Sequence, residues 1–118
     1  MHELEFCHKT LFIWEDWRQD IGGKLWTPGL LMAHFLAYLH DLAAHSHLRA
    51  PFENKTVLEF GSGCGVTGLV AAILGARVTF TDLPCVVPNL RLNVEFNVQH
   101  LNLPAEHHSV VEHVWGSP

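Results

Sequence analysis

The sequence predicts an α/β domain with a parallel sheet and crossover helices, preceded by an N-terminal strand or hairpin and one helix. Two observations predict this fold. From Thr56 onward, segments typical of strands and helices alternate as βαβαβ, an order that gives parallel strands joined by right-handed crossovers. A glycine-rich turn separates the first of these strands from its helix. The chain has 118 residues, 48% of them apolar, which is enough for one domain.

The N-terminal region ends before a helix. Leu4 to Trp14 mixes apolar and polar residues and predicts one strand or a loose hairpin, followed by a polar loop. Thr27 and Pro28 predict a helix start, with the threonine hydroxyl as cap and proline in the first turn. Apolar residues then recur at helical spacing to about His45, which predicts a buried helix in which His34 and His40 find local partners.

The remaining elements form the βαβαβ core. The predicted strands are Thr56 to Phe60, Arg77 to Thr81 and Ser109 to Val114. The predicted helices are Val66 to Leu74, and a second that begins at Pro84 or Pro88 and runs to about Val98. We therefore divide a single domain into residues 1–26 (strand and loop), 27–49 (helix) and 56–116 (core).

The turn after the first core strand carries glycines at positions 61, 63 and 65. A helix begins there and offers free N–H groups and a partial positive charge, and bare glycines let a ligand approach them closely. Asp82 ends the neighbouring strand, so we expect its carboxylate to reach the ribose hydroxyls of a nucleoside lying across the turn. The pattern predicts a nucleoside-containing cofactor.

Glu59 indicates which cofactor. Gly63-x-Gly65-x-x-Gly68 also satisfies the dinucleotide fingerprint, so an NAD-binding half-domain is one alternative. The Glu59 carboxylate would repel a pyrophosphate over the turn, whereas S-adenosylmethionine (SAM) has no phosphate and brings an ammonium and a sulfonium. Glu-x-Gly-x-Gly-x-Gly is the signature turn of class I SAM-dependent methyltransferases, and residues 59–65 match it in full.

The chain resembles one branch of that class, the methyltransferase-like protein-lysine methyltransferases with seven strands. "TVLEFGSGCGVTGLVAAILGARVTFTDLPCVVPNLRLNVEFN" resembles their cofactor half, "GGKLWTPGLLMAHFL" their Gly-x-x-x-Trp segment and following helix, and Trp115-Gly116 the Trp-Gly after their third strand. The resemblance runs from about Phe6 to Gly116. It implies the N-terminal half of a Rossmann-like sheet, SAM as cofactor and a protein side chain, lysine before others, as substrate.

The resemblance also implies residue roles. Gly61, Gly63 and Gly65 would hold the methionine end of SAM, and Glu59 would brace the loop and favour the ammonium. Asp82 would bind the ribose hydroxyls. Adenine would lie between Leu83 and Trp115, and Trp26 would line the methionine pocket. The resemblance assigns no catalytic residue within these positions.

The sequence departs from the family after Trp115-Gly116. There the family continues into a fourth strand that ends in an Asp-x-x-Tyr type motif facing the substrate, whereas this sequence stops at Pro118. We expect a partial domain whose first core strand keeps a bare edge open to self-association. A catalytically inactive SAM-binding fragment, or an interaction module, is therefore an alternative to an active enzyme.

Composition excludes several other classes. A net charge of −5 without a Lys/Arg cluster argues against a nucleic-acid partner, and the polar residues of the apolar helix argue against a membrane span. Three cysteines without a C-x-x-C and no secretory start predict a reducing compartment, the cytoplasm, with the nucleus as alternative.

Three other groups of polar residues have structural interpretations. The ten histidines lack the spacing of a zinc site, so we predict no metal site. Cys64 lies at a helix N-terminus, where a thiol pKa tends to fall, but no base accompanies it and we predict a small residue that fills the turn. Asn93 and Asn97 are expected to cap or tie down backbone, with a direct contact to SAM as the alternative.

Overall fold

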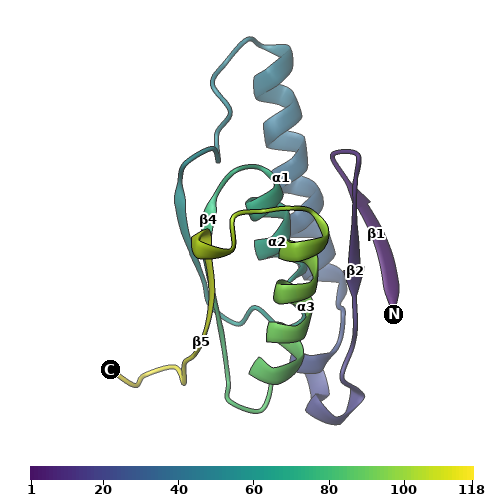
Figure 1. Ribbon diagram of the computed structural model, residues 1–118, viewed down its shortest axis with the longest axis vertical. Coiled ribbons are helices and arrows are strands. Elements are labelled where there is room, and N and C mark those ends of the chain that lie inside the picture. Colours follow the sequence, from purple (N-terminus) through teal and green to yellow (C-terminus); the bar gives the residue numbers. More distant parts are fainter.

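The computed structural model describes residues 1–118, except for the side chains of residues 19–21. Its elements form three layers: a sheet, a layer of helices and a hairpin (Figure 1). The sheet contains three parallel strands in the order β3-β4-β5. The strands of the sheet are β3 (Thr56–Glu59), β4 (Arg77–Asp82) and β5 (His108–Glu112); the helices are α1 (Thr27–His45), α2 (Val66–Ile73) and α3 (Val87–His100). The predicted α/β fold with crossover helices is confirmed.

The helices cover one face of the sheet. Glu59 lies opposite Phe80, which lies opposite Val110, and these residues point toward the helices. Leu58 and its partner Thr79 point to the other face, where Leu58 is 56% exposed while Phe80 is 0% exposed. Figure 1 shows the helices on one side of the strands, and no described helix lies on the other. Because β3 lies at one edge, self-association through that edge stays a prediction.

The N-terminal segment is a hairpin of β1 (His2–Phe6) and β2 (Lys9–Ile13). Cys7 and His8 both have positive φ angles, 50° and 64°, as a two-residue turn of type I′ requires. Leu11 and Ile13 are fully buried against the helices, so the hairpin closes the core on the side opposite the sheet. A short 3-10 helix, η1 (Trp17–Gly23), replaces the predicted loop, and η2 (Ala105–His107) precedes β5.

The start of α1 differs from the prediction. Trp26, with an extended backbone, is the cap residue; Thr27 lies inside the helix, and no side chain makes a cap hydrogen bond. Pro28 occupies the first turn, as predicted.

The burial of α1 also differs. Ala33 and Ala43 are the buried residues, whereas the large apolar residues of the predicted buried face are mostly exposed. The exposed ones are Leu31, Phe35 and Leu42, and Met32 and Tyr38 outside that face are exposed as well. The ring of His34 packs against Phe6 at 4.8 Å, but Nδ1 of His40 is buried without a hydrogen-bond partner, so the prediction for His40 was wrong.

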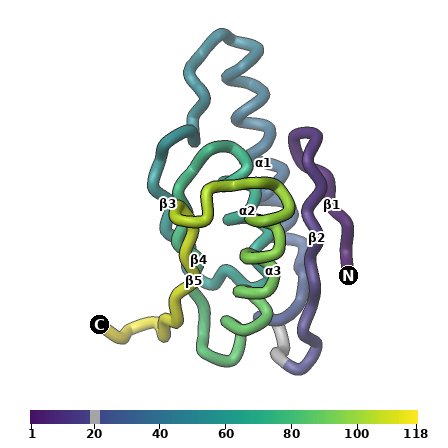
Figure 2. The backbone as a smooth tube through the Cα atoms, in the orientation of Figure 1, coloured from purple at the N-terminus to yellow at the C-terminus, as the bar shows by residue number. Residues whose placement is uncertain are grey.

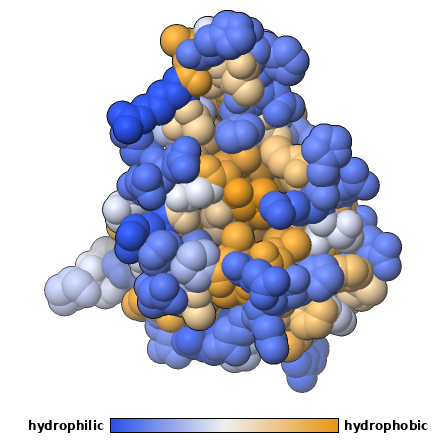
Figure 3. Space-filling view, turned by 45° about the horizontal axis from the view of Figure 1, so that its top comes forward, coloured by the Kyte–Doolittle hydropathy of each residue, from blue (hydrophilic) through white to orange (hydrophobic). Residues whose placement is uncertain are grey.

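Apolar residues also reach the surface elsewhere. Figure 3 shows one face, on which apolar residues gather in the middle with hydrophilic residues around them. The tube in Figure 2 places the two ends of the chain on opposite sides of the molecule. No described helix is both long enough and apolar enough to cross a membrane.

Candidate functional site

The glycine-rich turn joins β3 to α2 with a backbone that side chains would strain. Gly61, Gly63 and Gly65 have φ angles of 65°, 59° and 92°, all in the left-handed region. A Cβ on Gly61 would lie 3.5 Å from Cζ2 of Trp115, and one on Gly63 would lie 3.5 Å from the carbonyl oxygen of Gly22. The turn therefore presents bare backbone between Trp115 on one side and Gly22 on the other.

Hydrogen bonds from the neighbouring strand hold the turn in place. The N–H of Ser62 donates to the carbonyl of Thr81 at 2.9 Å, and the N–H of Thr81 donates to Oγ of Ser62 at 3.1 Å. The hydroxyl of Thr81 donates to the carbonyl of Glu59 at 2.7 Å. The ends of β3 and β4 are therefore locked together, and this fixes Glu59 relative to Asp82.

The Asp82 carboxylate lies against the turn. Its Oδ2 accepts a hydrogen bond from the N–H of Gly63, and its Oδ1 accepts one from the N–H of Leu83, both at 2.7 Å. The carboxylate thus spans the ends of both strands, as the parallel order predicts. A carboxylate has about four acceptor positions, so these two bonds leave room for hydroxyl donors.

The Glu59 carboxyl group is buried beside the turn. Burial, with a smaller contribution from the charge of Asp82, raises its pKa to about 7, although a hydrogen bond from Ser62 opposes the rise. Its Oε1 is buried and has no hydrogen-bond partner. A Cβ on Gly68 would lie 2.8 Å from this oxygen, so the missing side chain at position 68 makes the room that Glu59 occupies.

Two adjoining cavities surround the turn. The larger, of about 680 Å³, lies within the size range of small-molecule sites. It is lined by six of the eight residues that the sequence predicts: Trp26, Gly61, Gly63, Asp82, Leu83 and Trp115. The smaller, of about 290 Å³, shares Trp26, Gly61 and Gly63 with it and adds Glu59 and Gly65. The fold thus brings all eight predicted residues to one place.

Other residues of the larger cavity were not predicted. Arg18, whose Nε donates to Oδ1 of Asp16 at 2.8 Å, brings a cation to the wall. Cys85 and His113 also line it, and the N–H of His113 donates to the carbonyl of Asp82 at 2.9 Å. His113 directly follows β5, so the rule that ligands bind at the carboxyl ends of parallel strands could have found it. The sequence carried no comparable signal for Arg18.

Cys64 is a packing residue and not a reactive thiol. Burial, and secondarily the negative charge of Glu15, raises its pKa to about 12, the opposite of the fall that a helix N-terminus favours. Its thiol donates to the carbonyl of Gly23 at 3.4 Å. This supports the prediction that Cys64 fills the turn. Among the described residues, no group of three His, Cys, Asp or Glu side chains is placed to hold a metal ion.

Comparison with known proteins identifies the family. The sequence profile of a family described as lysine methyltransferase matches residues 5–117. Protein N-lysine methyltransferase METTL21A of Xenopus tropicalis is 34% identical over 96 residues, which cover 80% of this chain and 40% of the relative. Its Mus musculus counterpart is 32% identical over 115 residues, covering 96% and 47%.

A relative with a different name is nearly as similar. EEF1A lysine methyltransferase 3 of Xenopus tropicalis is 29% identical over 101 residues, which cover 84% of this chain and 41% of the relative. The chain thus spans less than half the length of these curated relatives. The matched region includes the glycine-rich turn, both cavities and nearly every element of the fold. The chain belongs to the lysine methyltransferase family.

Proposed function

We propose that this chain binds S-adenosylmethionine at the glycine-rich turn and serves the methylation of lysine side chains in proteins. One observation carries the proposal. The Glu59 carboxyl group is buried with an unpartnered oxygen, directly beside a turn whose backbone is bare. A buried polar atom without a partner is costly, and a ligand ammonium would supply the missing donor.

The residues fit the parts of this cofactor. Glu59 and Gly65 line the smaller cavity and would face the methionine end, together with Trp26, Gly61 and Gly63. Asp82 keeps acceptor positions for the ribose hydroxyls. Leu83 and Trp115 line the larger cavity with exposed side chains and would flank the adenine. A dinucleotide fits less well because its pyrophosphate would lie near two carboxyl groups.

The chain's own contribution to the reaction is binding and orientation. When bound, the cofactor supplies an electrophilic methyl group. The turn and the two cavities would hold that group in a fixed position, so that a neutral amine could approach it in line. The acceptor lysine must first lose a proton, and we assign no residue of this chain to that step. We assign no catalytic residue.

The substrate class follows the relatives. Two of them are named protein N-lysine methyltransferases, and a third is named for lysine methylation of EEF1A. We infer a protein substrate with a lysine acceptor, and a reducing compartment, the cytoplasm or the nucleus, because all three cysteines are free. A chain that binds the cofactor without turnover would instead be the inactive fragment considered above.

Calorimetric titration of the purified chain with S-adenosylhomocysteine tests the proposal, with NAD as control. We expect micromolar binding of the first and none of NAD. Asp82→Asn should weaken binding at least tenfold because it removes a charge that holds the turn, whereas Asp41→Asn on the exposed surface of α1 should not. Binding of NAD alone, or equal affinity in the Asp82 variant and the unmodified chain, contradicts the assignment.

A further inference from the structure

Asn93 on α3 connects three segments that are far apart in the sequence. Its Oδ1 accepts a hydrogen bond from the N–H of Trp14, and its Nδ2 donates to the carbonyl of Trp14, both at 2.9 Å. The same Nδ2 also donates to the carbonyl of Cys64 at 3.0 Å. One side chain that is 0% exposed therefore binds the residue that follows β2 and the centre of the glycine-rich turn.

Asn97 makes an almost identical set of bonds one helical turn later. Its Oδ1 accepts from the N–H of Phe12 at 2.9 Å, and its Nδ2 donates to the carbonyl of Phe12 at 2.8 Å. Its second acceptor is the carbonyl of Asn93, at 2.7 Å, and not the turn. Asn97 is also 0% exposed.

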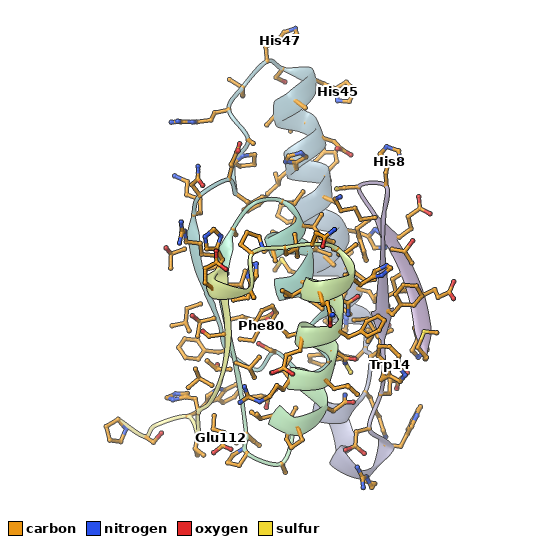
Figure 4. All side chains as sticks on the ribbon, in the orientation of Figure 1. His8, Trp14, His45, His47, Phe80 and Glu112 are labelled. Carbon is orange, nitrogen blue, oxygen red and sulfur yellow. The ribbon has the colours of Figure 1, made fainter. Side chains whose placement is uncertain are left out.

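The spacing of these two residues explains why they match the hairpin. Four residues of a helix rise about 6 Å, and two residues of a strand rise about 6.6–6.8 Å, so side chains four apart on α3 reach backbone groups two apart at β2. Each amide presents one acceptor and one donor, as a neighbouring strand would. The free edge of β2 is thus paired with side chains, and Figure 4 shows Trp14 where the hairpin faces α3.

The contact of Asn93 with the turn reaches the wall of the larger cavity. From Trp14 the chain continues into η1, and Arg18 and Gly22 line this cavity. The far end of η1 returns to the turn, where the carbonyl of Gly23 accepts bonds from the N–H of Asp16 at 2.7 Å and from the Cys64 thiol at 3.4 Å. Asn93 therefore fixes the position of Trp14, from which η1 continues, relative to Cys64 in the glycine-rich turn.

We propose that Asn93 is a positioning residue for cofactor binding, whereas Asn97 serves stability alone. This inference rests on the proposed function, because it concerns the affinity of the glycine-rich turn for its ligand. Asn93 lines neither cavity, so it acts through Cys64 and Trp14 and not by contact with the ligand. Loss of this buried hydrogen-bond donor would leave the Cys64 carbonyl without its partner on α3 and let the turn sample other conformations.

Paired aspartate substitutions test this. Asn93→Asp and Asn97→Asp each keep the oxygen that accepts the strand N–H, and each place a carboxylate oxygen against two carbonyls. Both should lower the melting temperature, because both break one bond to the hairpin and one other buried bond. The Asn97 variant should lose at least as much, because the Trp14 carbonyl keeps a bond from Nδ2 of Asn89 at 2.9 Å. The dissociation constant of S-adenosylhomocysteine, measured well below both melting temperatures, should rise about tenfold or more only in the Asn93 variant.

The outcomes separate the two proposals. If the unmodified chain binds no S-adenosylhomocysteine, the proposed function fails. If the unmodified chain binds and the two variants lose affinity equally, or neither loses it, the role of Asn93 is overturned while the function stands. Should either aspartate variant not fold, Asn93→Ala and Asn97→Ala give the same comparison without a buried charge.

Hydrogen exchange in the unmodified chain provides a second measurement that needs no variant. If Asn93 couples the turn to the hairpin, the amides of Gly65 and Trp14 should exchange through a common opening with one free energy. Bound S-adenosylhomocysteine should then protect both amides, although Trp14 lines neither cavity. Independent opening of the two amides, or protection of Gly65 alone, would contradict the coupling.

Discussion

The two faces of the sheet use similar residues in opposite environments. On the covered face, Phe80 and Val78 are buried under the helices, and Figure 4 shows Phe80 between β4 and that layer. On the open face, Leu58 of β3 is exposed, and the polar pair Thr79 and Ser109 join through their hydroxyls at 3.3 Å. The difference teaches that residue type alone does not locate the core here. β4 alternates in polarity as one covered face requires, whereas β3 carries an apolar residue on each face, Val57 on the covered face and Leu58 on the open one.

The largest expected effect is on the covered face. Phe80→Ala should lower the free energy of unfolding by about 3–5 kcal/mol because it leaves a cavity under α2. Leu58→Ala, on the open face of the neighbouring strand, should cost less than about 1 kcal/mol. Urea unfolding of both variants measures the difference. Equal losses would mean that the open face is covered in solution.

A close packing contact gives the next effect. A Cβ on Gly68 would lie 2.4 Å from Cε2 of Phe80, so Gly68→Ala should destabilise the fold by about 1–3 kcal/mol through overpacking. Gly29→Ala is the matched control in another helix, because its Cβ would meet only ordinary contacts at 3.5 Å. Thermal unfolding should show a lower melting temperature for Gly68→Ala and no decrease for Gly29→Ala. A drop shared by both would contradict the packing argument.

The buried carboxyl group makes the covered face sensitive to pH. Because the pKa of Glu59 rises from 4.5 to about 7, the folded chain holds its proton more tightly than the unfolded chain. Stability should therefore be higher below about pH 4.5, fall as the pH rises from there to about 7, and then level off. The fall should be on the order of 1–2 kcal/mol after allowance for solvent screening.

Substitution identifies the group responsible. Glu59→Gln should remove most of this slope in denaturant unfolding at several pH values. Glu112→Gln, at the exposed end of β5, should leave the slope in place. A slope that survives in the Glu59 variant would show that another group causes it.

The smallest effect is expected on the open face itself. Leu58→Thr gives β3 the polarity that β4 already has there, and should change the free energy of unfolding by about 0.5 kcal/mol or less. Sedimentation at increasing concentration should show less self-association than in the unmodified chain, because the exposed edge becomes less apolar. Unchanged association would show that β3 does not take part in the contact between chains.

Much of the fold could be predicted because local patterns coincide with tertiary structure. The bounds of α1 agree with the prediction, although its cap residue does not, and the parallel core strands agree to within two residues. The glycine pattern and the acid at the end of β4 located the turn, because parallel strand ends meet at one edge. These signals are local in sequence or follow from topology.

The features that the sequence did not predict depend on tertiary packing. The large apolar residues of α1 predicted its buried face, but the helix, which packs against α2, buries the small residues Ala33 and Ala43 instead. Arg18 lines the larger cavity because η1, in which it lies, runs beside the glycine-rich turn. The burial that raises the pKa values of Glu59 and Cys64 also depends on segments distant in the chain. No periodicity or spacing in one sequence reports such contacts.

The bonds between Asn97 and Phe12 also bear on how the chain is made. The two residues are 85 positions apart, and a ribosome adds about 5–20 residues per second, so roughly 4–17 s pass before the second one follows the first. During that time the outer edge of β2 lacks the side chain of α3 that pairs with it. The hairpin is therefore made well before the helix that pairs its outer edge, and it depends on being kept from other strands meanwhile.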